Sequence, residues 1–222
     1  MKTIERGRPF TAADLDALPF VTAGARVELV DGSLLVHGTF TRADLDAMPE
    51  DGRRYELLDG MLVVTPAPSF RHQRIVGELY PVLRAACPPG LHVLFAPFDV
   101  ALAEATVTQP DLLVAPREAF TAKELPVAPL LAVEVLSSST RRIDLGLKRE
   151  RHERAGTASY WVIDPSEPSL IAWQLDGGRY VEVGHAVGEE TFEASQPFPV
   201  RITPARWSAE MSTGGNAGRR AS

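Results

Sequence analysis

A duplicated segment near the start of the 222-residue chain constrains its fold more than any other sequence feature. The residues FTAADLDALP from Phe10 recur as FTRADLDAMP from Phe40, and GARVELVDGSLLV from Gly24 recurs as GRRYELLDGMLVV from Gly52. A solenoid needs at least about three repeats to bury a continuous face, so two copies exclude a repeat array. The chain therefore carries one supersecondary unit twice.

Each copy predicts a short helix followed by a β-hairpin. Thr11 and Thr41 are typical helix N-caps, and the Asp-Gly pairs at 31–32 and 59–60 are strong hairpin-turn signals. Only the second copy continues into a segment with one apolar helix face, formed by Ile75, Leu79, Val82 and Leu83. We therefore expect residues 1–39 to be an extra N-terminal half-copy that forms an added layer. A chain starting near Thr39 is expected to fold and to keep its activity, with at most a modest loss of stability.

The rest of the chain predicts more strands than helices. The charged segment 141–156 predicts a helix that ends at Gly156, and residues 208–222, which have few apolar side chains, predict a disordered tail. Together these patterns favour an α/β or α+β fold with a mixed sheet, spanning residues 40–207. The predicted strands are residues 92–102, 110–115, 129–136, 159–164, 169–175, 179–183 and 197–202.

Composition narrows the function classes. The 23 Lys and Arg residues against 29 Asp and Glu residues give a net charge of −6, which excludes nucleic-acid binding by bulk electrostatics alone. The one cysteine, Cys87, excludes an internal disulfide, and no Cys/His cluster has zinc-ligand spacing. No apolar run is long enough for a signal peptide or a membrane span, so we expect a cytoplasmic protein without a membrane association.

Glu134, in the middle of the apolar run LLAVEVL, is the most informative single residue. An ionised carboxylate in a buried strand is costly unless it is paired or bound to a metal. Asp111 begins another short strand directly after Pro110, and adjacent strands would bring the two carboxylates together. Two hard oxygen donors and a main-chain oxygen would form an Mg²⁺ or Mn²⁺ site. The alternatives are a turn or cap role for Asp111 and an arginine or backbone partner for Glu134.

Two further residues fit phosphate chemistry beside such a site. Lys148 in the charged segment would supply a cation near a nucleophilic water or a transition-state oxygen. Glu56 is a third acid in an apolar setting, but the repeat has Glu28 at the matching place, so the acid equally fits a role in the hairpin itself. The arginines around Lys148 fit either a solvated helix face or a cationic rim.

These motifs together resemble the Uma-two family of restriction endonucleases, which is similar to the PD-(D/E)XK nuclease superfamily. The resemblance rests on YELLDGMLVV, RHQRIVGEL, QPDLLV, LLAVEVLSSST and YWVIDP and extends over residues 40–207. It implies a restriction-endonuclease-like mixed sheet flanked by helices, with Asp111 and Glu134 as metal ligands and Glu56 as an accessory acid. His72 and Asp144 are secondary site candidates.

The lysine departs from the superfamily pattern. Alternation along a strand places residue 136 on the same face as Glu134, but that residue is Leu136, not lysine. The resemblance implies that Lys148, displaced to the following helix, takes its place.

The sequence thus predicts an Mg²⁺-dependent endonuclease that hydrolyses phosphodiester bonds in DNA, with a homodimer as an open possibility. One alternative is a catalytically inactive nuclease-fold module for DNA association or protein interaction. A paired-carboxylate glycosidase is another, in which Lys148 would have no role.

Overall fold

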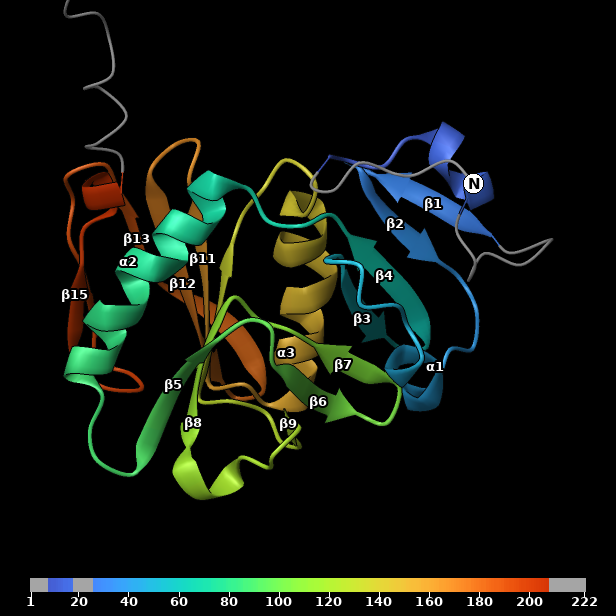
Figure 1. Cartoon of the computed structure of the whole chain (residues 1–222). Helices are drawn as coiled ribbons and strands as arrows, with labels where there is room; N and C mark the ends of the chain where they lie inside the picture. Colours follow the sequence, from blue (N-terminus) through green and yellow to red (C-terminus); the bar gives the residue numbers. More distant parts are fainter. Residues whose placement is uncertain (1–7, 18–25, 208–222) are drawn as a thin grey trace, which may run out of the picture.

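The computed structural model describes residues 8–17 and 26–207, which form two large sheets with a helix between them (Figure 1). The first sheet has seven strands in the order β1-β2-β4-β3-β7-β6-β9 and the second has six in the order β13-β12-β11-β10-β8-β5. Each sheet contains one parallel pair, β6 with β9 and β10 with β11, and is otherwise antiparallel. The predicted mixed α+β architecture is therefore confirmed.

The elements of the first sheet are β1 (Val27–Val30), β2 (Ser33–Val36), β3 (Arg54–Leu58), β4 (Met61–Thr65), β6 (Asp99–Ala103), β7 (Thr106–Thr108) and β9 (Glu124–Leu125). Those of the second are β5 (Leu91–Phe95), β8 (Leu112–Pro116), β10 (Leu131–Val135), β11 (Ser159–Asp164), β12 (Ser169–Asp176) and β13 (Arg179–Val187). A separate pair follows, β14 (Phe192–Ala194) with β15 (Val200–Ile202), and short 3₁₀ turns occupy η2 (Arg117–Ala119) and η4 (Pro204–Trp207).

Both copies of the repeat form the predicted helix and hairpin. Thr11 and Thr41 open η1 (Ala12–Ala17), which is a 3₁₀ helix, and α1 (Arg42–Asp46). Each threonine donates from its backbone N and its Oγ1 to the aspartate three residues later, at 2.8 Å in the first copy and 2.7 Å in the second. In both Asp-Gly turns the two residues have positive φ, as a type I′ hairpin turn requires.

The two hairpins pair with each other through a local two-fold axis. Strand β2 runs antiparallel to β4 with Leu35 opposite Val63, and these residues are equivalent in the repeat because 63 minus 35 is the same 28-residue offset that relates Gly52 to Gly24. Leu34 faces Val64, and Val36 faces Leu62. The first copy therefore covers the β4 edge that would otherwise expose unpaired backbone groups.

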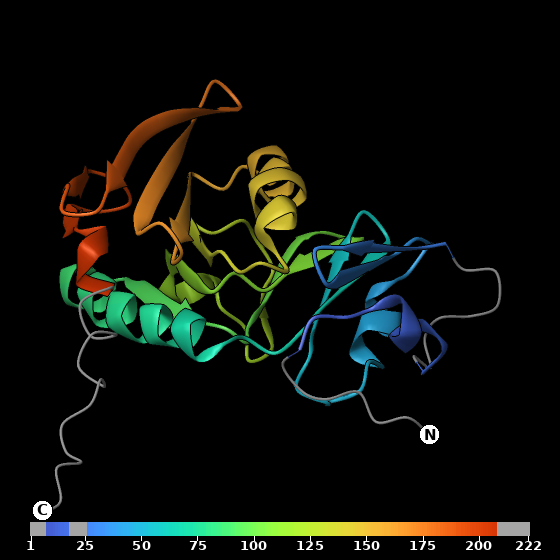
Figure 2. The same cartoon turned by 90° about the horizontal axis from the view of Figure 1, so that it is seen from above.

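The helix between the sheets comprises a π-helical segment, η3 (Ile143–Lys148), that continues as α3 (Arg149–Ala155) (Figures 1 and 2). Ile143 packs with Leu35 and Leu58 of the first sheet, whereas Leu145 packs against the cluster around Tyr160 of the second. The helix ends at Gly156, whose φ of 88° is the predicted left-handed C-cap. The helix η3–α3 therefore packs against both sheets.

Helix α2 (Phe70–Ala86) covers the other face of the second sheet. Ile75, Leu79 and Leu83 lie in the largest hydrophobic cluster with residues of β8 and β10, which confirms three of the four predicted core positions as fully buried. Of the helices within residues 8–17 and 26–207, none combines the length and the hydropathy that a bilayer crossing needs.

The single strand predicted for residues 92–102 is wrong. The segment divides into β5 and β6, which lie in different sheets, and the chain passes from one to the other at Ala96-Pro97. Proline has no backbone N–H to continue a strand ladder, which explains the break. The predicted disordered tail, residues 208–222, lies outside the described residues.

Candidate active site

Lys148 lies at the centre of a buried group of carboxylates. Its Nζ lies 2.9 Å from Glu56 Oε2, 3.2 Å from Glu134 Oε1 and 3.5 Å from Asp144 Oδ1. All four side chains are no more than 2% exposed. The structure therefore brings together three of the four main residues expected from the sequence, together with the secondary candidate Asp144.

Strand alternation aims two of these acids at the lysine. In β3, Tyr55 and Leu57 pack into the core of the two hairpins, so Glu56 points to the opposite face. In β10, Val133 and Val135 pack toward α2, so Glu134 points away from α2 and toward η3. The two acids thus come from different sheets and meet between them.

Leu136 occupies the strand position where the superfamily pattern has its lysine, and the ammonium group beside Glu134 comes from the helix instead. It shares the Glu134 face of β10 and packs with Leu145 of η3, as part of an apolar cluster. The π-helical segment places Asp144 and Lys148 on its buried side, at positions i and i+4. A helix against this strand can therefore deliver an ammonium group to the Glu134 carboxylate without a lysine in the strand.

Asp111 is held by three donors beside this group. Its Oδ1 accepts from Arg54 Nη2 at 2.7 Å, and its Oδ2 lies 2.9 Å from His72 Nε2 and accepts from the Val135 backbone N at 2.8 Å. Asp111 directly precedes β8, which pairs with β10, so the prediction of adjacent strands is confirmed. A carboxylate has about four lone-pair sites, and the described residues fill only one of the two on Oδ1.

Burial and nearby charges shift the pKa values of these acids in different directions. Burial raises the pKa of Glu134 well above its usual value, and the nearby acids Asp144, Asp111 and Glu56 add to the rise against the opposing effect of Lys148. Burial likewise raises the pKa of Asp144 to about 6. For Asp111, burial acts in the same direction, but Arg54 and His72 outweigh it and hold the pKa below the usual range.

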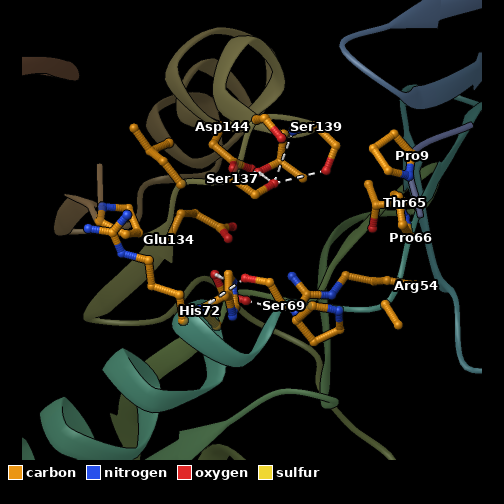
Figure 3. Close-up of a pocket in the computed structure, with 18 of the residues that line it drawn as sticks. Pro9, Arg54, Thr65, Pro66, Ser69, His72, Glu134, Ser137, Ser139 and Asp144 are labelled. Atoms are coloured by element: carbon orange, nitrogen blue, oxygen red, sulfur yellow. Dashed lines mark hydrogen bonds and ion pairs between the residues drawn. The ribbon is translucent and has the colours of Figure 1, made fainter. Parts of the chain in front are cut away.

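The acids line a cavity of about 270 Å³ between the sheets (Figure 3). Glu134 and Asp144 lie on one side of it, and Pro9, Thr65 and Pro66 lie on the other. The segment Ser137–Thr140 and the first residues of α2 complete the wall. The cavity is therefore built from both copies of the repeat and from both sheets.

The donor chemistry fits a hard divalent cation. Four carboxylates (Glu56, Asp111, Glu134, Asp144) face two permanent cations, Arg54 and Lys148, which leaves a formal charge of 2 minus 4, or −2, when the acids are ionised. Glu56 Oε2 and Asp144 Oδ1 are buried, pair with the Lys148 ammonium group and have no hydrogen-bond partner among the described residues. An added cation would compensate this excess of buried negative charge.

Such an ion would not be enclosed by side chains. Across the described ranges, no three His, Cys, Asp or Glu side chains form a ready ligand set. Asp111, Glu134 and a main-chain oxygen would leave positions for water, which is the coordination that Mg²⁺ commonly keeps in proteins.

The structure also separates the site from residues that resemble it. Glu28, the repeat equivalent of Glu56, pairs with Arg26 and His37 away from the cavity.

Arg54, which holds Asp111, is a site residue that the sequence patterns did not single out. Its position two residues before Glu56, on the same strand face, was the available signal.

The arginines of the charged segment are mostly committed to nearby acids. Arg151 contacts Asp59 and Glu150, Arg154 contacts the same two acids, and Arg141 pairs with Asp164. These contacts favour the solvated-face interpretation over a free cationic rim.

The family model Uma2, described as "Putative restriction endonuclease", matches residues 42–208, which is most of the chain. The chain belongs to the Uma2 family. This confirms the resemblance that the sequence motifs indicated, and the first copy of the repeat precedes the matched region.

A solved structure shares the fold of this Uma2 protein. It is described as a putative nuclease belonging to DUF820 from Anabaena variabilis, and it aligns with a TM-score of 0.59 at 19% sequence identity. The alignment covers 76% of this chain and 98% of the other. No curated protein matches the chain in sequence.

Proposed function

We propose that this protein is an Mg²⁺-dependent endonuclease that hydrolyses phosphodiester bonds in DNA. The observation that carries the proposal is the buried group of Glu134, Glu56 and Asp144 around Lys148, next to Asp111, at a cavity in a chain of the Uma2 family. Asp111 and Glu134 would hold the ion. When bound, the ion supplies Lewis-acid stabilisation of the phosphate and lowers the pKa of a bound water.

The chain's own residues have separate tasks in this proposal. Lys148 orients the Glu134 carboxylate and provides positive charge near the reacting phosphate, where charge develops in the transition state. Arg54 and His72 hold Asp111 in one orientation and keep it ionised. Glu56 is itself fixed, because its Oε1 accepts from the Gln109 backbone N at 2.7 Å, and so it keeps Lys148 in place from the opposite sheet.

The mouth of the cavity fits a nucleic acid better than a small anion. Phe70, the first residue of α2, is 77% exposed between the cavity-lining residues Ser69 and Arg71. Exposed aromatic rings stack on bases, and arginines contact phosphates. The same observations speak against the glycosidase alternative, because Lys148 contacts all three acids and keeps any two of them from acting as an isolated pair.

A cleavage assay with the Glu134→Gln variant tests this function. Supercoiled plasmid, single-stranded DNA and RNA are incubated with the protein in Mg²⁺, Mn²⁺ or excess EDTA, and metal binding is measured by calorimetry. We expect the wild-type chain to nick DNA only with a divalent ion. We expect Glu134→Gln to fold, to lose metal binding and to cleave at least about 100-fold more slowly, since electrostatic catalysis is lost.

Glu153→Gln is the matched control, because Glu153 lies on α3 and pairs with Arg179 and the Tyr180 backbone instead of facing the cavity. It should bind metal and cleave like the wild-type chain. Unchanged metal affinity in Glu134→Gln would refute the ligand assignment. A wild-type chain that binds DNA without cleaving it would support the inactive DNA-associated module instead.

A further inference from the structure

The first copy of the repeat contacts the Ser137–Thr140 wall of the cavity through a buried hydroxyl. Ser33, the first residue of β2, is 0% exposed, and its Oγ donates to the backbone carbonyl of Ser139 at 2.6 Å. Ser139 belongs to the segment Ser137–Thr140, all of which lines the cavity. The bond therefore joins two parts of the chain that are 106 residues apart.

The repeat itself shows that the hairpin does not need this hydroxyl. The 28-residue offset places Met61 at the equivalent position of the second copy, and Met61 packs with apolar residues. Burying a hydroxyl is unfavourable unless it makes a hydrogen bond. The serine at position 33 is therefore explained by its contact with Ser139 and not by the hairpin.

The same strand also supports the helix that follows the segment. Leu35, two residues after Ser33 and so on the same face of β2, packs with Ile143 of η3. Between these two contacts, the Asp144 backbone N donates to the Thr140 carbonyl at 2.9 Å. Strand β2 thus contacts the loop and the helix start that lead to Asp144 and Lys148.

We propose that Ser33 is a positioning residue of the candidate active site, which holds the Ser137–Thr140 wall in register with Asp144 and Lys148. This inference rests on the proposed nuclease function. It assigns the extra half-copy of the repeat a task in the site, because it provides the donor that fixes one wall. Ser33 itself contacts no reacting group.

Two measurements on the full-length chain test this assignment. The first is hydrogen–deuterium exchange of residues 137–144, which does not depend on activity. Ser33→Ala should exchange faster there than the wild-type chain. Val36→Ala is the matched control: it shortens a fully buried side chain of the same strand that packs in the hairpin core, on the face opposite Leu35, and should leave this segment unchanged.

The second measurement is the steady-state cleavage rate. Ser33→Ala should lower kcat about tenfold with KM for DNA changed less than about twofold, because a small misplacement of catalytic groups slows the chemical step more than binding. Val36→Ala should keep the wild-type kcat.

Unchanged exchange in Ser33→Ala overturns the positioning role, and so does a kcat loss that Val36→Ala shares in full. A wild-type chain without cleavage would refute the nuclease function, whereas the exchange result would still decide whether Ser33 holds the wall.

Discussion

At the scale of single residues, Lys148 combines a catalytic position with a structural one. The sequence alone leads to the expectation that Lys148→Ala slows cleavage and leaves metal affinity roughly intact. The structure shows three buried carboxylates that depend on this ammonium group, which raise the pKa of Lys148 despite the opposing effect of burial. We expect Lys148→Ala to lose about 3–5 kcal/mol of unfolding free energy, because removal of one partner leaves buried charge uncompensated.

Urea unfolding monitored by circular dichroism measures this loss, and Lys123→Ala, at an exposed position, is the control. Equal stability of Lys148→Ala and wild type would mean that the acids reorganise or become protonated at no cost.

His152, in α3 of the same helix, makes the stability of the protein depend on pH. It is fully buried, its Nδ1 lies 2.9 Å from Thr157 Oγ1, and burial together with Lys148 lowers its pKa to about 3. The unfolded chain takes up a proton near the ordinary pKa of about 6.5, whereas the folded chain does not, so stability falls as the pH drops from about 6.5 toward 3.

We expect His152→Asn to lose less stability than wild type between pH 7.5 and pH 5.5. Urea midpoints at the two pH values provide the comparison, and the acids common to both chains cancel in the difference. The same pH dependence in both chains would contradict a neutral buried imidazole.

At the scale of elements, the helix between the sheets contains two glycines with opposite requirements. Gly146 is in the π-helical segment, is exposed, and has open space where a Cβ would lie. Gly156 ends the helix at a φ of 88°, which side chains rarely adopt. We expect Gly146→Ala to stabilise the chain by about 0.5–1 kcal/mol and Gly156→Ala to destabilise it by about 1 kcal/mol.

Thermal unfolding of the two variants gives opposite shifts in Tm under this expectation. A loss of stability in Gly146→Ala would show that the π-helical segment needs glycine there, and a cleavage assay would then show whether the Lys148 position moves with it.

At the scale of the whole molecule, the first copy of the repeat forms β1 and β2 at one edge of the first sheet, and it lies outside residues 42–208, which match the family model. The sequence predicts that a chain starting near Thr39 keeps its fold and activity. The contacts of Ser33 and Leu35 change that expectation, since both would be lost together with the partner of β4. We expect this truncated chain to have a lower Tm and to self-associate through the β4 edge.

Size-exclusion chromatography with light scattering measures the mass over a dilution series, with the full-length chain as reference. Pairing of two β4 strands about Val63 would reproduce the local two-fold axis that relates β2 to β4. A truncated monomer with the Tm of the full-length chain would show that the first copy is an independent layer.

Local patterns in the sequence determined much of this protein. The caps at Thr11 and Thr41, the two Asp-Gly turns and the glycine end of the central helix depend on neighbouring residues, and all formed as predicted. Glu134 was identifiable because a charge in an apolar strand requires a partner, whatever the rest of the fold. The family motifs then placed Asp111, Glu56 and Lys148 at one site.

Tertiary structure alone decided which partner each buried group has. Glu56 and Glu28 stand at the same place in the repeat, yet only Glu56 faces Lys148, because β3 lies beside the central helix and β1 lies at the sheet edge. The bonds of Arg54 to Asp111 and of Ser33 to Ser139 join residues 57 and 106 positions apart. The sequence near Arg54 and Ser33 does not show which partner each residue has, since the packing of two sheets against one helix decides it.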